Sequence, residues 1–500
     1  MLALLRIAFR NMWEHRAKSL IIGSFIALGV IILLIGNSLL DSSKIGVQKA
    51  FIENFTGDVM VYGPSAQAVS VFGEGGEDQS GEIPTIPDYE KVQAYLAELT
   101  NIRAYASMSV AYGLLTLDAT EDVQDVVNSE EEQNGPPITI VFGVEGAKYF
   151  SMFPSVELEE GAFIKPGEPG IMLSRGQLEK LEKRFKKALH VGDRVLVTGF
   201  GTQNFKIREL AITGIYKRSL SSSLPDFLSF TDIDSARVLG GLTLGANEAA
   251  QISEAEKSLL SIDNTDDLFS DDMIDSVQTG TVNLDAITER LSSSAERERL
   301  NQADTGAWHF ILIRLDNPGL ASFFIKDLNS WFQQEGIDAH ATNWQGAAGT
   351  YGKFSDIVRI VFIIAILLVS VVAVIIMMNT LVISVIERTS EIGTMRALGA
   401  QRKTIRRLFL AETLSLTAVF GFIGALLSLI LVTILNTLHI SAGDNGLLVL
   451  LFGGEVLHLS PTPRAFISSV FLVFIVGYLA HLYPVSLALK IPPVKAIQTD

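Results

Sequence analysis

The stretch Glu387–Arg407, ERTSEIGTMRALGAQRKTIRR, lies between two long uncharged runs, Ile360–Ile386 and Thr413–Leu438. Each run is longer than the roughly 20 apolar residues that an α-helix needs to cross a lipid bilayer. The stretch holds six Lys or Arg residues against two Glu residues. Because short loops rich in Lys and Arg stay on the cytoplasmic side of a membrane, the sequence predicts a cytoplasmic hairpin between two membrane-spanning helices.

The first half of this hairpin has the spacing of a helix. Ile392, Met395 and Leu398 fall on one face. Gly399 follows where a left-handed C-cap ends such a helix, and a second, basic helix returns to the membrane. The pattern predicts a short, stiff and partly apolar knob that docks into a groove on a cytoplasmic partner. A basic loop that only sets topology is the alternative, but it would leave the three apolar side chains exposed without a role.

The rest of the chain completes a topology with four membrane helices. Residues 19–40 carry no charge and follow a basic amphipathic segment, in which Trp13 is expected at headgroup depth. A signal peptide has a shorter apolar core and ends in small residues, so this run is interpreted as an uncleaved helix. The predicted order is an interfacial helix at 1–18, membrane helix 1 at 19–40, an extracytoplasmic domain at 41–356, membrane helix 2 at 357–386, the coupling segment at 387–407, membrane helix 3 at 408–437, an outer loop at 438–464, membrane helix 4 at 465–489 and a cytoplasmic tail at 490–500.

The large segment between the first two membrane helices differs in composition from the ends of the chain. Residues 41–356 have a net charge of −23, whereas the remaining residues have a net charge of +7. This acidic bulk argues against nucleic-acid binding, which needs a clustered basic face. Strand and helix patterns alternate irregularly along the segment, and this predicts an α+β domain. Residues 242–305 are acidic and rich in Ser and Asp, which is typical of a loosely structured insertion.

No catalytic or metal-binding pattern is visible in the sequence. Gly352-Lys353 lacks the earlier glycine and the following Ser or Thr of a phosphate-binding loop. The seven histidines are scattered, and no cysteine is present to act as a thiolate ligand. We therefore expect a non-enzyme that needs no metal or cofactor of its own, and any ATP to be bound by a separate subunit.

Several residues near the membrane are candidates for helix packing. Glu412, one turn into the third helix, is expected to pair with Arg406 or Arg407 near the inner surface. Gly421 and Gly424 offer a small-residue face for close helix contact. The Tyr483-Pro484 pair is expected to kink or end the fourth helix.

The hairpin and the outer segment both resemble the FtsX/MacB-type permeases of ABC transporters, the family that also contains the lipoprotein-releasing LolC/LolE permeases. Glu391-Ile392-Gly393 followed by Arg396-Ala397-Leu398-Gly399-Ala400 is similar to the family's coupling-helix signature. Short motifs of the outer domain occur in an order similar to that of the family's periplasmic domain; they are Phe142-Gly143-Val144, Glu160-Gly161, Pro166-Gly167-Glu168, Val191-Gly192-Asp193 and Ile212–Tyr216.

The resemblance implies an inner-membrane permease subunit that works with a cytoplasmic ABC ATPase dimer and with a second permease, either a copy or a paralogue. It implies Glu391, Ile392, Gly393, Met395, Arg396, Leu398, Gly399 and Ala400 as the ATPase-coupling residues. Three functions stay open on the sequence: release of lipoproteins or another amphiphile from the outer leaflet, MacB-like export of a peptide, drug or toxin with a periplasmic adaptor, and FtsX-like signalling to a cell-wall hydrolase.

Overall fold

The structure is a computed structural model, and it describes residues 10, 13–14, 16–65, 68–73, 83–117, 137–200, 205–218, 227–245, 298–443, 448, 452, 454 and 456–490. Most of the predicted interfacial helix, the greater part of the acidic insertion and the C-terminal tail lie outside these residues. The chain divides into two compact units. One unit comprises Met1–Ala50 with Lys353–Asp500, and the other comprises Phe51–Gly352.

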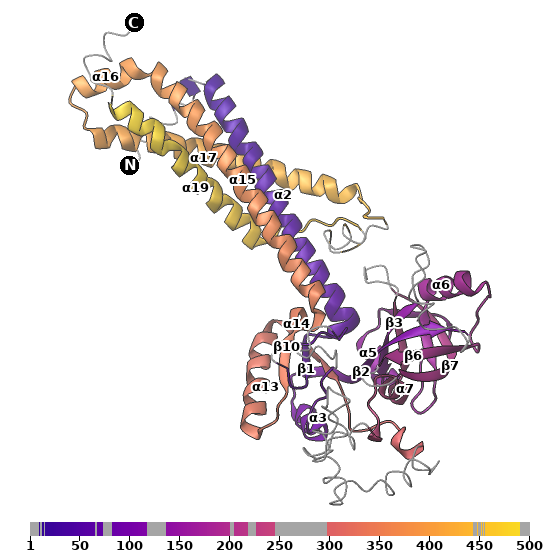
Figure 1. Ribbon diagram of the computed structural model, residues 1–500. Coiled ribbons are helices and arrows are strands. Elements are labelled where there is room, and N and C mark those ends of the chain that lie inside the picture. Colours follow the sequence, from indigo (N-terminus) through magenta and orange to yellow (C-terminus); the bar gives the residue numbers. More distant parts are fainter. Residues whose placement is uncertain are drawn as a thin grey trace, which may run out of the picture. The chain divides into compact units, whose positions relative to one another are not determined.

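The first unit is built on four long helices that run beside one another (Figure 1). They are α2 (Arg16–Phe51), α15 (Thr350–Glu387), α17 (Arg402–Thr437) and α19 (Pro463–Lys490). Within the described part of the chain, four helices are long and apolar enough to cross a membrane, one in each of these segments. The predicted fold class, four membrane helices with a large mixed domain between the first and the second, is confirmed.

Helix α2 is longer than the membrane span predicted at residues 19–40. It continues to Phe51 and passes directly into a short π-helical turn, η1 (Ile52–Thr56). The polar residues that follow Leu40 are compatible with a helix, so the end of the uncharged run does not mark the end of the helix. The second compact unit begins at Phe51, whereas the predicted extracytoplasmic domain begins at residue 41.

The bundle has an apolar interior that contains isolated polar side chains. Ile26, Leu34, Met377 and Val476 are among its buried members. Asn37 of α2 donates a hydrogen bond to Ser469 of α19, with a distance of 2.9 Å between Nδ2 and Oγ. An interhelical hydrogen bond of this kind helps to fix how two membrane helices pack.

The outer end of the bundle is closed by the segment that connects α17 to α19. Asn436 at the end of α17 pairs with the backbone of Leu459 through both of its amide atoms, at 2.9 and 2.8 Å. Ser42 of α2 accepts a hydrogen bond from the backbone N–H of Ser460 at 2.8 Å. The connection is thus fastened to both α17 and α2.

The second unit is organised around a ten-stranded mixed sheet. Its order is β10-β1-β9-β2-β3-β8-β5-β7-β4, and β6 pairs with both β2 and β7. The strands are β1 (Val59–Tyr62), β2 (Ile102–Thr116), β3 (Ile138–Val144), β4 (Val156–Gly161), β5 (Ile171–Ser174), β6 (Arg194–Phe200), β7 (Phe205–Arg218), β8 (Leu228–Asp232), β9 (Phe310–Leu315) and β10 (His340–Asn343).

The strand pairings divide this sheet into two parts. Because β6 bridges β2 and β7, the six strands β2, β3, β8, β5, β7 and β6 close into a ring. Val141, Val197 and Ile212 are buried in the core of this part, together with Leu178 and Leu181 of α6 (Arg175–Phe185). Of the four remaining strands, β4 pairs with β7, and β1, β9 and β10 share a second core with α3 (Tyr89–Glu98) and α13 (Ala321–Glu335).

Two shorter helices pack against strands of the sheet. They are α5 (Gly146–Met152) and α7 (Ile233–Leu239). Arg237 of α7 is buried, stacks over the ring of Trp308 at 4.3 Å, and donates to the carbonyl oxygens of Ala307 and Thr305 at 3.0 and 2.8 Å. This buried cation ties α7 to the chain that leads into β9.

Both ends of the outer unit meet in one aromatic cluster. The ring of Phe51, at the end of α2, lies 6.3 Å from the ring of Trp344 in α14 (Trp344–Ala348) and 5.9 Å from that of Tyr351 at the start of α15. Phe72 lies 5.6 Å from Tyr351 on the same cluster. Aromatic pairs at these separations add to the free energy gained by burial, so the first and last residues of the unit are held together.

Candidate functional site

The hairpin at the inner end of the bundle carries the predicted coupling residues. Helix α16 (Thr389–Ala397) follows α15 after a single residue, and Gln401 is the N-cap of α17. Gly399 has a φ of +98°, a conformation that favours glycine over residues with a side chain. The backbone N–H groups of Gly399 and Ala400 donate to the carbonyls of Arg396 and Met395, so the predicted glycine turn at the end of the helix is present.

The apolar face of α16 is not uniformly exposed. Ile392 is only 3% exposed and packs with Val385, Ile405, Phe409 and Val485, residues of α15, α17 and α19. The prediction that Ile392, Met395 and Leu398 together form the docking face is therefore wrong for Ile392. The reason is that a short connection on each side folds α16 back against the base of the bundle, and the side facing the bundle is buried.

Leu398, unlike Ile392, is exposed. Its side chain is 85% exposed, next to the exposed Gly399. Gly393 is buried beside Ile392, Met395 and Arg396 are half-buried, and Ala400 is intermediate. An apolar side chain this exposed at the end of a helix whose other face is anchored is available for contact with another protein.

An ion-pair cluster lies behind α16. Nη1 of Arg388 donates to both carboxylate oxygens of Glu412, at 2.9 and 3.1 Å, and its Nε donates to Glu391 at 3.0 Å. The predicted pairing of Glu412 with Arg406 or Arg407 is thus wrong, because both of those side chains are exposed. Sequence reasoning missed Arg388, although its spacing of three residues from Glu391 on a helix was an available signal.

Burial and charge act in opposite directions on Arg388. Its side chain is 10% exposed, and that of Glu412 is 16% exposed. Burial disfavours the charged guanidinium, yet the pKa of Arg388 is raised above its ordinary value because Glu412 and Glu391 stabilise the charge. Arg388 is therefore fully charged at physiological pH.

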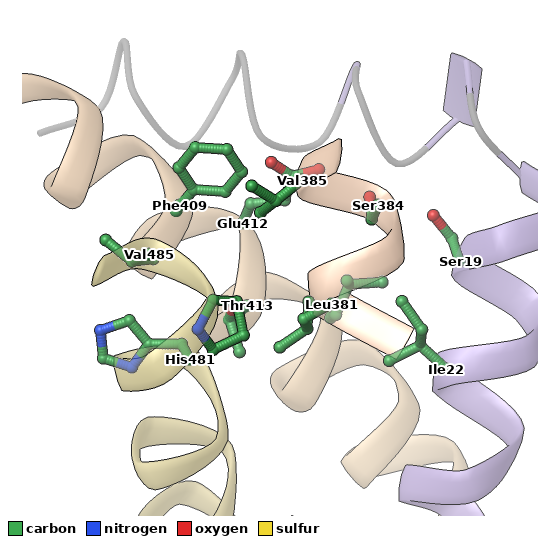
Figure 2. Close-up of a pocket in the computed structure, with 12 residues that line it drawn as sticks. Ser19, Ile22, Leu381, Ser384, Val385, Phe409, Glu412, Thr413, His481 and Val485 are labelled. Atoms are coloured by element: carbon green, nitrogen blue, oxygen red, sulfur yellow. The ribbon is translucent and has the colours of Figure 1, made fainter. Parts of the chain in front are cut away.

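A small cavity lies beside Glu412, among α2, α15, α17 and α19 (Figure 2). It has a volume of about 30 Å³, enough for one or two water molecules. Its polar lining comes from Ser19, Ser384, Glu412, Thr413 and His481, and the rest of the lining is apolar. The ring nitrogen Nδ1 of His481 bonds to the carbonyl of Tyr478 in its own helix.

The other predicted membrane residues occupy different positions. Gly424 is in close contact with Ala27 and Val30 of α2, whereas a Cβ atom added at Gly421 would have only Val473 near it, at 4.0 Å. Pro484 is buried within α19, which continues to Lys490; of the predicted alternatives at this position, a kink or an end, the end is therefore wrong. Tyr483 is 56% exposed and Trp13 is 68% exposed.

The geometry of the site is suited to contact with a partner. Among the residues that the structure describes, no three His, Asp or Glu side chains are grouped so as to hold a metal ion. What the geometry offers is a rigid apolar contact point, Leu398, fixed to three membrane helices by a buried cluster and an ion-pair cluster. This is the form of a contact site at the inner end of a membrane subunit.

The comparisons with known proteins agree with this class. Residues 363–493 match the FtsX-like permease C-terminal family, and residues 20–262 match the MacB-like periplasmic core domain family. The chain belongs to the FtsX/MacB-type family of ABC transporter permeases. It is a multi-pass protein of the inner membrane with a large periplasmic domain.

The matches to individual relatives cover very different shares of each relative's length. The lipoprotein-releasing system transmembrane protein LolE of Haemophilus influenzae is 26% identical over 343 residues, which are 64% of this chain and 80% of LolE. The macrolide export ATP-binding/permease protein MacB of Pasteurella multocida is 50% identical over 54 residues, which are 11% of this chain and only 8% of that protein. The crystal structure of the periplasmic region of MacB from Actinobacillus actinomycetemcomitans matches with a TM-score of 0.31 and 10% identity, over 60% of this chain and 94% of that one.

Proposed function

We propose that this chain is the permease subunit of an ABC complex that releases lipoproteins, or another amphiphile, from the outer leaflet of the inner membrane. The observation that carries the proposal is the anchored tip of α16, with Leu398 exposed and Ile392 buried. A cytoplasmic ATPase dimer would bind this tip, hydrolyse ATP in its own subunits, and push on the hairpin. The likeness to LolE over 80% of LolE's length supports the cargo class.

The long helices supply a route for this push. Helix α15 has 38 residues and no break between Thr350 and Glu387, so it is about 57 Å long at 1.5 Å per residue. Its first residues belong to the aromatic cluster of the outer unit, and its last residue adjoins the hairpin. Movement at the cytoplasmic end is thereby passed to the root of the periplasmic domain, and force rather than cargo crosses the bilayer.

A second candidate is export of a peptide, drug or toxin from the periplasm with an adaptor. It is favoured by the high local identity to MacB, a protein named for macrolide export, although that match covers 54 residues. In both cases a second permease copy or paralogue would complete the complex. The partner decides between them: a crosslinked lipoprotein supports the first function, and a periplasmic adaptor supports the second.

The test uses the full chain, purified with the ATPase subunit that accompanies it. Leu398→Asp places a charge on the contact point, and it should abolish recovery of the ATPase subunit and the ATP hydrolysis of the preparation. Leu438→Asp is the matched control, because Leu438 is 62% exposed at the opposite end of α17. Recovery of an active ATPase with Leu398→Asp at the level of the control would refute the docking role of α16.

A further inference from the structure

The position of α16 is not determined by α16 itself. The helix has nine residues, and isolated helices this short are only marginally stable in water. Its N-cap, Arg388, makes no side-chain capping hydrogen bond, and its C-terminal connection turns at Gly399. The orientation of the exposed tip therefore depends on what holds the helix from behind.

One of the two contacts that hold it is apolar. Ile392 inserts among Val385, Ile405, Phe409 and Val485, and Met395 of the same helix packs against this cluster. Such packing keeps the helix against the bundle, but dispersion and burial are not directional. Apolar packing at Ile392 and Met395 therefore holds the helix against the bundle without supplying a directional bond.

The second contact is directional. The guanidinium of Arg388 donates along two edges, with Nη1 to Glu412 on α17 and Nε to Glu391 on α16. Its Cζ atom also lies 5.9 Å from the centre of the Phe409 ring. A planar guanidinium offers donors in a fixed fork, whereas an ammonium is a point charge that cannot reproduce this arrangement.

The two arms of the bridge differ in strength. Arg388 and Glu412 are largely shielded from water, whereas the side chain of Glu391 is 56% exposed. Screening by water and salt weakens an exposed ion pair much more than a shielded one. The shielded arm to Glu412 fixes the guanidinium to α17, and the weaker arm to Glu391 then sets the rotation of α16.

We infer that Arg388 is a positioning residue: it fastens the coupling helix to the base of α17, so that α16 and α17 move as one body. This assigns α17, in addition to α15, as a path for the push. The inference rests on the proposed function for the purpose of that movement, but the fastening is a property of this chain alone and can be measured without an ATPase.

The test measures a distance by electron spin resonance in the full chain. Because the sequence contains no cysteine, Thr394→Cys and Ala418→Cys introduce two spin labels without background. Both side chains are exposed; Thr394 lies on α16, and Ala418 lies near the middle of α17. The otherwise unchanged chain should give one narrow distance distribution.

Arg388→Gln should broaden this distribution and add a second population. Arg388→Lys should do the same, because it keeps the charge and loses the fork. Arg407→Gln is the control, since it removes the same charge from an exposed position on α17. Adding Glu412→Gln to Arg388→Gln should produce no further broadening, because the two residues act through one bond.

Overlapping distributions for Arg388→Gln and the unchanged chain would overturn the inference. If Arg388→Gln fails to fold, Glu391→Gln gives the same decision, because it removes only the exposed arm; an unchanged distribution there means that Arg388 does not orient α16. The positioning role of Arg388 and the proposed function can fail separately. If the unchanged chain gives the narrow distance distribution but binds no ATPase subunit, the proposed function is refuted and the positioning role of Arg388 stands.

Discussion

Gly424 permits a close approach between α17 and α2, and its replacement by alanine should loosen the bundle. A Cβ atom at Gly424 would lie 2.7 Å from the carbonyl oxygen and 2.8 Å from the Cα of Ala27, and 3.0 Å from the Cβ of Val30. Two of these three neighbours are backbone atoms of α2, which cannot turn aside as a side chain can. The helices would have to separate by about 0.7 Å to bring the oxygen contact to 3.4 Å, the lower limit of ordinary contact.

Overpacking of this kind costs about 1–3 kcal/mol, which corresponds to a loss of several degrees in melting temperature. Gly421→Ala is the matched control three residues away, because its Cβ would have one neighbour at 4.0 Å. Alanine is also the better helix former, so the control should be neutral or slightly stabilising.

The assay uses a buried thiol as the reporter of bundle opening. Ser428 is fully buried on the same helix, and Ser428→Cys would be the only cysteine in the chain. The temperature at which this thiol reacts with a maleimide should fall with Gly424→Ala and stay constant with Gly421→Ala. Equal temperatures for the two variants would show that α2 and α17 do not pack closely at Gly424, and the reasoning would be refuted.

Three further predictions concern other parts of the chain. Arg237→Met should destabilise the outer domain by about 2–4 kcal/mol in urea unfolding, because it leaves buried carbonyls unpaired, whereas Arg194→Met, at an exposed ion pair, should cost under about 1 kcal/mol. Burial lowers the pKa of His309 from 6.5 to about 3. The unfolded chain therefore binds a proton below pH 6.5 that the folded chain rejects, so stability is complete above pH 6.5 and is lost as the pH falls toward 3. The loss from this group should be about 2 kcal/mol at pH 5, and His309→Asn should remove that part of the difference between urea midpoints at pH 7 and pH 5. Asn436→Leu should release the segment around Leu459 from α17, measured as faster proteolysis of the connection between α17 and α19.

The membrane part of the fold follows from the sequence with few alternatives. Twenty or more uncharged residues have only one stable form in a bilayer, a helix, and the basic hairpin orients all four. The ends of these helices were less predictable. Helix α2 extends to Phe51 and α19 passes through Pro484, because helix propensity and tertiary packing, rather than hydropathy, decide where a helix stops.

The site was predictable in its location but not in its inner contacts. The motif at Glu391 and Gly399 marked the hairpin and its glycine turn correctly. The periodicity of the sequence could not show which apolar residues of the hairpin face the bundle. Ile392 and Leu398 are both apolar and at helical spacing, and only the packing of the other helices against Ile392 distinguishes them. The Arg388–Glu412 pair joins residues 24 positions apart, and only the return of α17 beside α16 brings them together.

The outer domain begins and ends in the same aromatic cluster, where Phe51 and Tyr351 are in contact. A module of about 300 residues whose two termini are neighbours can be inserted into an antiparallel helical hairpin without displacing either helix. The membrane machinery and the periplasmic attachment can therefore change independently in evolution. Grafting residues 51–352 onto the helix pair of another permease should therefore preserve both folds.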